Sequence, residues 1–212
     1  SSVVIDQKTG HIKAIMGGRD QAGVRILDRA SAIPRQPGSS IKPIATYTPA
    51  LDNGYNLATG MDDVPLLMNE DDEPWPQNVY EYYMGIVPIR KAIEMSINTI
   101  AVRTLDEVGI PTSLEYLKNF GIIKEDGDDN FVTAEENSQT NDENLAALGV
   151  GAMTHGLTAL DMTAAYAALA NDGTYIEPLT FSKIEDSTGK VLFDSDDVIT
   201  HEVTSKETAY QM

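Results

Sequence analysis

The segment 35–43 reads Arg-Gln-Pro-Gly-Ser-Ser-Ile-Lys-Pro, which places a serine three residues before a lysine at a predicted helix start. Residues i and i+3 lie on one face of a helix, with Cβ atoms about 5–6 Å apart. A lysine whose pKa is lowered by burial and by the positive end of a helix can take the proton of a serine hydroxyl. We therefore expect Ser39 to be a nucleophile and Lys42 its general base. The alternative is that Ser39 is an ordinary helix N-cap.

A second Ser-x-x-Lys pattern occurs at 187–190, as Ser-Thr-Gly-Lys. It lies in a predicted hairpin turn, so its serine and lysine share no helical face. A pattern that fixes two common residues is expected about once by chance in a chain of this length. We interpret 187–190 as that chance occurrence.

The chain has a single Ser-x-Asn pattern, Ser96-Ile97-Asn98. In extended or loop backbone, residues i and i+2 point the same way. A serine hydroxyl there can relay a proton between a lysine and a leaving amine, and an asparagine amide can both donate to and accept from a peptide bond. The alternative is a polar break between two helices. We expect Ser96 to be catalytic and Asn98 to bind substrate.

Composition excludes several other kinds of site. The 212 residues include no cysteine, which excludes a disulfide framework, a thiol nucleophile and cysteine-ligated metal sites. The three histidines, His11, His155 and His201, form no metal-binding pattern. The formal net charge of −18 argues against a nucleic-acid partner. We predict neither a metal nor a cofactor.

The order of the predicted elements favours the α+β class, with a helical block between strands of an antiparallel sheet. Apolar runs flanking turn residues predict one hairpin at 3–5 and 12–16 and another at 181–185 and 190–193. Residues 56–88 and 124–143 are predicted to be mostly loop. The predicted helices are 39–51, 89–108 with a break at 96–98, 112–120 and 158–169. Thr112 or Ser113 is expected to cap the third of them, and a capping box of Thr158 and Asp161 the fourth.

Both ends of the sequence suggest a fragment. The first residues carry neither a basic segment nor a long apolar run, so they are no signal peptide, and no apolar run approaches the ~18–20 residues of a membrane span. At the other end, Thr204 and Glu207 predict a capping box for a helix that the chain ends too soon to complete.

Taken together, these patterns resemble the transpeptidase domain of class A penicillin-binding proteins, a family with a Ser-x-x-Lys, Ser-x-Asn and Lys-Thr-Gly motif set. Residues 35–43 resemble its nucleophile segment, 92–102 its second-motif helix, and 148–178 the helix before its catalytic strand. The resemblance implies the penicillin-binding-protein and serine β-lactamase-like fold. It also implies that 1–212 is a partial transpeptidase domain, with a mostly helical subdomain at 44–155.

The Lys-Thr-Gly motif departs from the family pattern. Its only copy, Lys8-Thr9-Gly10, comes before the nucleophile and in the first predicted hairpin turn. We interpret it as a turn and expect the true third motif, with the last sheet strands, after Met212. That segment would be a partner required for activity.

The resemblance implies a D,D-transpeptidase that cross-links peptidoglycan stem peptides ending in D-Ala-D-Ala through an acyl-serine intermediate, and that β-lactams acylate. It also implies the extracytoplasmic face of a bacterial cell membrane. Two alternatives stay open. One is a serine β-lactamase or D,D-carboxypeptidase, which releases the acyl group to water. The other is a non-catalytic peptidoglycan-binding or scaffold domain.

Overall fold

The computed structural model describes residues 1–19, 27–69, 71–80, 82–195 and 198–212. By its internal contacts the chain divides into two units. The first comprises 1–35, 118–129 and 157–210, and the second comprises 36–117, 130–156 and 211–212. Among the described residues, no helix has both the length and the apolar character needed to cross a membrane.

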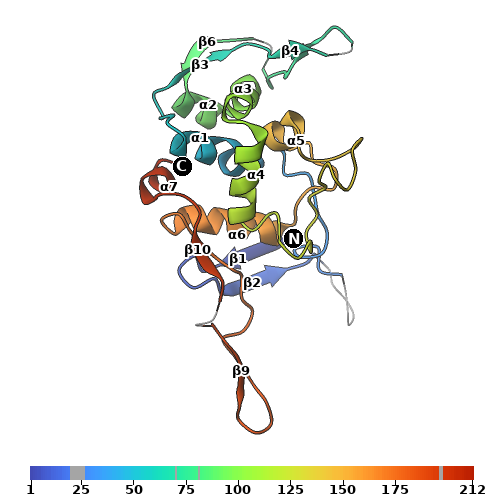
Figure 1. Cartoon of the computed structure of the whole chain (residues 1–212), viewed down its shortest axis with the longest axis vertical. Helices are drawn as coiled ribbons and strands as arrows, with labels where there is room; N and C mark the ends of the chain where they lie inside the picture. The colour runs from blue at the N-terminus through green and yellow to red at the C-terminus, as the bar shows by residue number, and fades with distance from the viewer. Residues whose placement is uncertain (20–26, 70, 81, 196–197) are drawn as a thin grey trace. The chain divides into compact units, whose positions relative to one another are not determined.

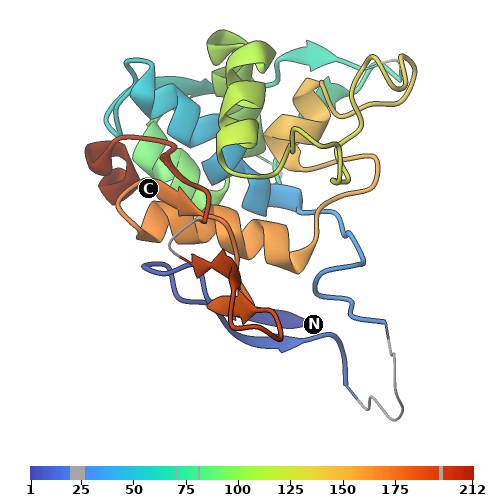
Figure 2. The ribbon, with the colours of Figure 1, turned by 60° about the horizontal axis from the view of Figure 1, so that its bottom comes forward.

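The first unit begins with the predicted hairpin. Strands β1 (Ser2–Ile5) and β2 (Ile12–Met16) pair antiparallel, and the carbonyl of Asp6 accepts from the backbone N–H of Gly10 at 2.9 Å to close the turn. Helix α6 (Ala159–Ala170) packs against β1, as Figure 1 and Figure 2 both show. The Lys-Thr-Gly sequence lies in this turn, as predicted.

Helix α6 begins with the predicted capping box. The Thr158 hydroxyl accepts from the Asp161 backbone N–H at 3.1 Å, and the Asp161 carboxylate accepts from the Thr158 N–H at 3.3 Å. Its core face consists of small residues, with Ala164, Ala165 and Ala168 buried. Small side chains let the neighbouring strand approach the helix closely.

The rest of the first unit is built from short strands and a final helix. Strand β7 (Thr174–Ile176) pairs with β10 (Thr200–Glu202), and β8 (Lys183–Glu185) pairs with β9 (Val191–Asp194) in the second predicted hairpin. The second Ser-x-x-Lys lies in that hairpin's turn, as predicted. Helix α7 (Lys206–Gln211) is capped by the hydroxyl of Ser205, which accepts from the Thr208 N–H at 3.1 Å, one residue later than expected.

The predicted helix at 39–51 is helical throughout but irregular. It runs as a 3₁₀ turn η1 (Gly38–Ile41), a π segment η2 (Pro43–Tyr47) and an α turn α1 (Thr48–Asp52). Two prolines explain the irregularity, because a proline has no N–H to close an i to i−4 bond. Pro49 leaves the Ala45 carbonyl without that donor, and the Ser113 hydroxyl donates to it at 2.6 Å.

The helices that follow carry the predicted break. Helix α2 (Ile89–Met95) ends at Ser96, and α3 (Asn98–Val108) begins two residues later. Helix α4 (Ile110–Asn119) begins two residues before the predicted start, and α5 is Leu145–Val150. The predicted cap of α4 is wrong, because the Thr112 hydroxyl donates to the Val108 carbonyl at 3.1 Å and that of Ser113 donates to Ala45.

The prediction that 56–88 is mostly loop is confirmed for the described residues, but the segment also contains four short strands that were not predicted. Strand β3 (Gly60–Asp63) pairs with β6 (Gly85–Pro88), and β4 (Leu67–Met68) pairs with β5 (Pro74–Trp75). Pro74 begins β5 and Pro88 ends β6, and a proline at a strand end disturbs the hydrogen-bond ladder least, while Pro65 and Pro76 lie outside the strands. Residues 124–143 form the predicted loop, without helix or strand.

One hydrophobic cluster of the second unit lies where η2, β3, α2 and α3 meet. Its buried members are Tyr47, Met61, Ile89, Ala92, Ile97, Ile100 and Ala101. Ile97 is the central residue of the Ser-x-Asn sequence and is fully buried. The polar residues on either side of it are thereby held at fixed positions against the core.

Candidate active site

Lys42 lies at the junction of η1 and η2, and its side chain is directed into the second unit with only 2% of its surface exposed. Its Nζ donates to the carbonyl of Ser96 at 2.8 Å, to the hydroxyl of Ser96 at 3.1 Å and to Oδ1 of Asn98 at 2.6 Å. The structure thus brings three of the four predicted site residues together, although 54 residues separate Lys42 from Ser96 in the chain.

Ser39 lies three residues before Lys42 on the 3₁₀ turn, with its side chain exposed. The 3₁₀ turn ends at Ile41, and Lys42 follows it directly with helical backbone angles. Within the described part of the chain, the Ser39 hydroxyl makes no hydrogen bond, and the bonds of Lys42 Nζ go to Ser96 and Asn98. The hydroxyl is therefore accessible from solvent, and the side chain of the lysine three residues later is buried.

Burial lowers the pKa of Lys42 to about 8 from the usual 10.5, because desolvation disfavours the charged ammonium. A pKa near 8 leaves roughly a tenth of these side chains as neutral amine at pH 7. An exposed lysine would be neutral in less than about a thousandth of molecules at that pH. The site therefore supplies an amine that can accept a proton near neutral pH.

Ser96 adopts a left-handed backbone conformation, with φ 55° and ψ 45°, where it ends helix α2. Its N–H donates to Ile93, and the next N–H, of Ile97, donates back to Ala92 at 2.9 Å. This conformation costs a non-glycine residue about 1–2 kcal/mol. The helix-ending turn directs both the carbonyl and the hydroxyl of Ser96 toward Lys42.

Asn98 is the first residue of α3, and both ends of its side-chain amide are engaged. Its Nδ2 donates to the carbonyl of Gln77 at 2.8 Å, which leaves Oδ1 for Lys42. An amide held on both sides keeps one orientation. Its Oδ1 is therefore presented to the lysine, and its second Nδ2 proton remains available to a ligand.

Sequence reasoning missed the contacts that hold the nucleophile segment in place. The side-chain amide of Gln36 donates to the carbonyl of Met153 and accepts from its N–H at 2.7 Å. This pair of hydrogen bonds resembles the pair that two residues of neighbouring β-strands exchange. Gly151, with φ +76°, lies directly against the backbone of Gly38. These contacts link residues more than a hundred positions apart, and no local pattern indicates them.

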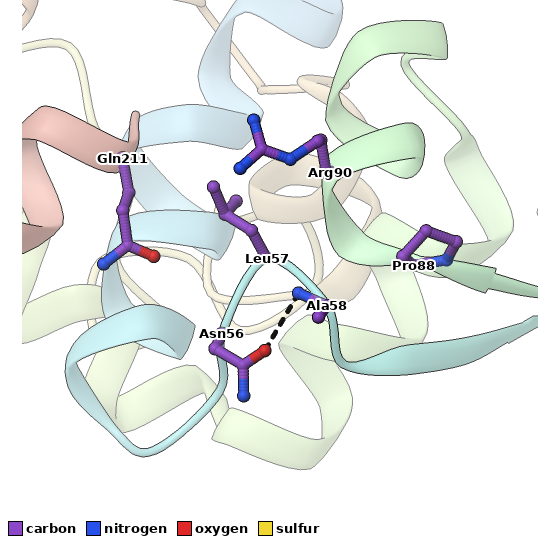
Figure 3. Close-up of a pocket in the computed structure, with 6 residues that line it drawn as sticks. All are labelled: Asn56, Leu57, Ala58, Pro88, Arg90 and Gln211. Carbon is purple, nitrogen blue, oxygen red and sulfur yellow. Dashed lines mark hydrogen bonds between the residues drawn. The ribbon is translucent and has the colours of Figure 1, made fainter.

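A separate hollow of about 560 Å³ lies elsewhere in the second unit, lined by Asn56, Leu57, Ala58, Pro88, Arg90 and Gln211. Figure 3 shows these side chains and the hydrogen bond from the Ala58 N–H to Oδ1 of Asn56, which measures 2.9 Å. None of the four predicted site residues lines it. The chemistry of the Ser39 segment is therefore not that of this hollow.

Comparisons with known proteins agree on one family. A model of the penicillin binding protein transpeptidase domain matches residues 1–212. Penicillin-binding protein 1A of Clostridium botulinum is 34% identical over 99% of this chain, and penicillin-binding protein 1F of Bacillus subtilis is 34% identical over all of it. The chain spans about a quarter of the length of each, 25% and 27%. The structure of PonA1 from Mycobacterium tuberculosis in complex with penicillin V is similar with a TM-score of 0.77 and 27% identity, covering 98% of this chain and 52% of that one.

Proposed function

The chain belongs to the penicillin-binding protein transpeptidase family and has its α+β fold, and we propose that it catalyses D,D-transpeptidation of peptidoglycan through an acyl-serine at Ser39. The proposal treats 1–212 as part of the domain, with 44–155 as a mostly helical subdomain. The donor is a stem peptide ending in D-Ala-D-Ala, which places the reaction on the extracytoplasmic face of the cell membrane.

In the first step, the Ser39 hydroxyl attacks the carbonyl carbon of the penultimate D-Ala. The neutral amine of Lys42 takes the hydroxyl proton as the Oγ–carbon bond forms. The buried position of Lys42 and its pKa of about 8 support this role, because an ammonium could not accept the proton. The backbone N–H of Ser39 supplies one donor to the oxyanion, an interaction of about 3–4 kcal/mol in other acyl transfers.

The tetrahedral intermediate collapses by breaking the carbon–nitrogen bond to the terminal D-Ala. The leaving amine needs a proton, and the Ser96 hydroxyl passes it on from the ammonium of Lys42. The 3.1 Å hydrogen bond between Lys42 Nζ and Ser96 Oγ supports this relay. The amide of Asn98 holds the donor peptide bond while the proton moves.

In the second step, an amine of another stem peptide attacks the acyl-serine. Its proton returns through Lys42 to the Ser39 oxygen, and the new peptide bond is the cross-link. A β-lactam carries a strained amide in place of the D-Ala-D-Ala bond and acylates the same serine. That PonA1 was solved with penicillin V supports this assignment.

The observation that carries the proposal is the hydrogen bonding of Lys42 Nζ to both polar residues of the Ser-x-Asn sequence. It connects two motifs that are distant in the chain, and Lys42 directly follows the 3₁₀ turn that carries Ser39. A helix N-cap serine would need no buried lysine beside it.

The test is intact-protein mass spectrometry of the complete protein that contains this chain, after incubation with penicillin. We expect an adduct of one penicillin on the unmodified protein and none on Ser39→Ala. Ser40→Ala is the matched control, because Ser40 is the neighbouring exposed serine and its hydroxyl donates to the Pro37 carbonyl at 2.6 Å. An adduct that persists in Ser39→Ala would overturn the assignment. An adduct released to water within minutes would indicate a β-lactamase, and no adduct at all a scaffold.

A further inference from the structure

Asp63 is a fully buried carboxylate at the end of strand β3, with 0% of its surface exposed. It accepts hydrogen bonds from the Asn78 side-chain amide at 2.7 Å, from the Met84 backbone N–H at 2.8 Å and from the Thr99 hydroxyl. These donors belong to the segment before β6 and to the first turn of α3. Burying a carboxylate costs free energy unless hydrogen-bond donors surround it, as they do here. The donors that surround it point to what this buried carboxylate does for the site.

The amide of Asn78 connects this carboxylate to helix α3. Its Nδ2 donates to Asp63, and its Oδ1 accepts from the backbone N–H groups of Asn98 at 3.0 Å and Thr99 at 3.3 Å. The residue before the helix, Ile97, gives α3 no side-chain cap of its own. Asn78 thus caps α3 from 20 residues away in the chain, a distance over which no sequence pattern for capping operates.

Asp63 also fixes which way the Asn78 amide faces. If that amide turned over, its NH₂ group would face the N–H groups of α3 and its oxygen would face the carboxylate. Both contacts would then be repulsive. The carboxylate therefore selects the orientation in which Asn78 caps the helix, and the carbonyl of the adjacent Gln77 accepts from Asn98 Nδ2 at 2.8 Å. The backbone and the side chain of Asn98 are thus both held by residues 77 and 78.

We propose that Asp63 is a positioning residue for acylation, which acts through Asn78 to hold Asn98 against Lys42. This inference rests on the proposed function, because it concerns the same site. Asp63 touches neither the nucleophile nor Lys42 among the hydrogen bonds of the described residues. Asp63 acts through the Asn78 cap. The contact that it preserves is the 2.6 Å hydrogen bond from Lys42 Nζ to Asn98 Oδ1.

A purely structural role and a positioning role predict different pH profiles. If Asp63 served only to stabilise the fold, Asp63→Asn would reduce the amount of active protein. The apparent pKa in the pH profile of the acylation rate would then be unchanged. If it positions Asn98, the ammonium of Lys42 loses an acceptor, and the pKa falls because the charged form is less stabilised. The measurement is the second-order rate constant for acylation by a fluorescent penicillin, on the complete protein between pH 5.5 and about 9.5.

For Asp63→Asn we expect the acylation rate constant at the high-pH plateau to be at least about tenfold lower than in the unmodified protein. The inflection point of its pH profile should lie at lower pH. Asn78→Ala should give the same downward shift while leaving the carboxylate in place. Asp142→Asn is the matched control. Asp142 is also fully buried in the second unit and accepts from the backbone N–H groups of Val132 at 2.9 Å and Thr154 at 2.6 Å. The Asp142→Asn substitution should lower the melting temperature without moving the inflection point of the pH profile.

A double-mutant cycle completes the test. In an Asn98→Ala background, Asp63→Asn should reduce acylation by less than about twofold, because the residue it positions is gone. Full additivity of the two losses would overturn the inference, and so would an unchanged inflection in a folded Asp63→Asn or Asn78→Ala protein. If the unmodified protein forms no penicillin adduct, the proposed function fails instead, so the two failures are distinguishable.

Discussion

Gly151 and Gly38 make a backbone contact that leaves no space for a side chain. A Cβ built on Gly151 would lie 2.2 Å from the carbonyl oxygen and 2.5 Å from the nitrogen of Gly38. Gly38 immediately precedes Ser39, so the C-terminal end of α5 sets the position of the proposed nucleophile. Gly151 also has φ +76°, where glycine is the favoured residue.

We therefore expect Gly151→Ala to displace the nucleophile segment and to lower the rate of penicillin acylation by about 10²-fold, since shifts near 1 Å have that effect on catalysis. Gly127→Ala is the control for backbone strain alone. Gly127 has φ +71°, and a Cβ there meets nothing within 4 Å. Both variants should lose some thermal stability, but only Gly151→Ala should lose acylation. Equal acylation rates in the two variants would contradict this account.

The pH dependence of acylation should follow the amine of Lys42. Burial lowers its pKa to about 8, so the neutral amine, which is the proposed base, becomes more abundant as the pH rises through that value. We expect the acylation rate to increase between pH 6 and about 9, with a half-maximum near 8. Lys42→Arg keeps a positive charge that cannot be lost, and it should abolish acylation at every pH. A rate independent of pH over this range would exclude Lys42 as the base.

Replacing Asn98 by aspartate should move the same profile in the opposite direction. Asn98→Asp places a carboxylate oxygen at the 2.6 Å contact with Lys42 Nζ, which stabilises the ammonium and raises its pKa above about 8. Acylation at pH 7.5 should fall, and the inflection should shift to higher pH. Asn144→Asp is the matched amide-to-carboxylate control. Asn144 caps α5, where a carboxylate also serves as a cap, and its replacement should leave the profile unchanged.

Ser96 allows stability and catalysis to be separated. Ser96→Gly relieves the left-handed conformation at φ 55°, whereas Ser96→Ala retains it, and both remove the hydroxyl while keeping the carbonyl that Lys42 binds. We expect both to lose acylation by about 10²-fold or more, because the relay is absent. The glycine variant should be the more stable by about 0.5–1 kcal/mol, as measured by urea unfolding. A glycine variant that is the less stable would show that the backbone is not strained there.

Local sequence signals predicted those parts of the fold whose determinants are local. The hairpin at 3–16 and the capping box of Thr158 and Asp161 depend on residues within a few positions of one another, and both are confirmed. The polar break at 96–98 was predicted for the same reason. The helix start predicted at Ser39 is confirmed as a 3₁₀ turn that ends directly before Lys42, whereas the pairing of the two side chains stays a prediction.

The parts that were missed depend on distant partners. Strand β3 reads Gly-Met-Asp-Asp, a sequence of poor strand propensity, and it is a strand because β6 pairs with it and Met61 enters the core. The predicted cap of α4 by Ser113 is wrong because the Ser113 hydroxyl donates to the Ala45 carbonyl. Pro49 has no N–H to donate to that carbonyl. The sequence pattern likewise could not show that Lys42 reaches Ser96 and Asn98, or that Asp63 holds the amide of Asn78.

An ammonium has three hydrogens, and Lys42 Nζ has an acceptor for each among the described residues. Once its proton departs, two hydrogens and one lone pair remain, so one of those acceptors loses its donor. The Ser96 carbonyl and the Asn98 oxygen have no hydrogen to offer the lone pair, but the Ser96 hydroxyl does. Rotation about the single Cβ–Oγ bond of Ser96 therefore reverses the direction of that hydrogen bond without moving a heavy atom, and the resting site accommodates both charge states of its lysine.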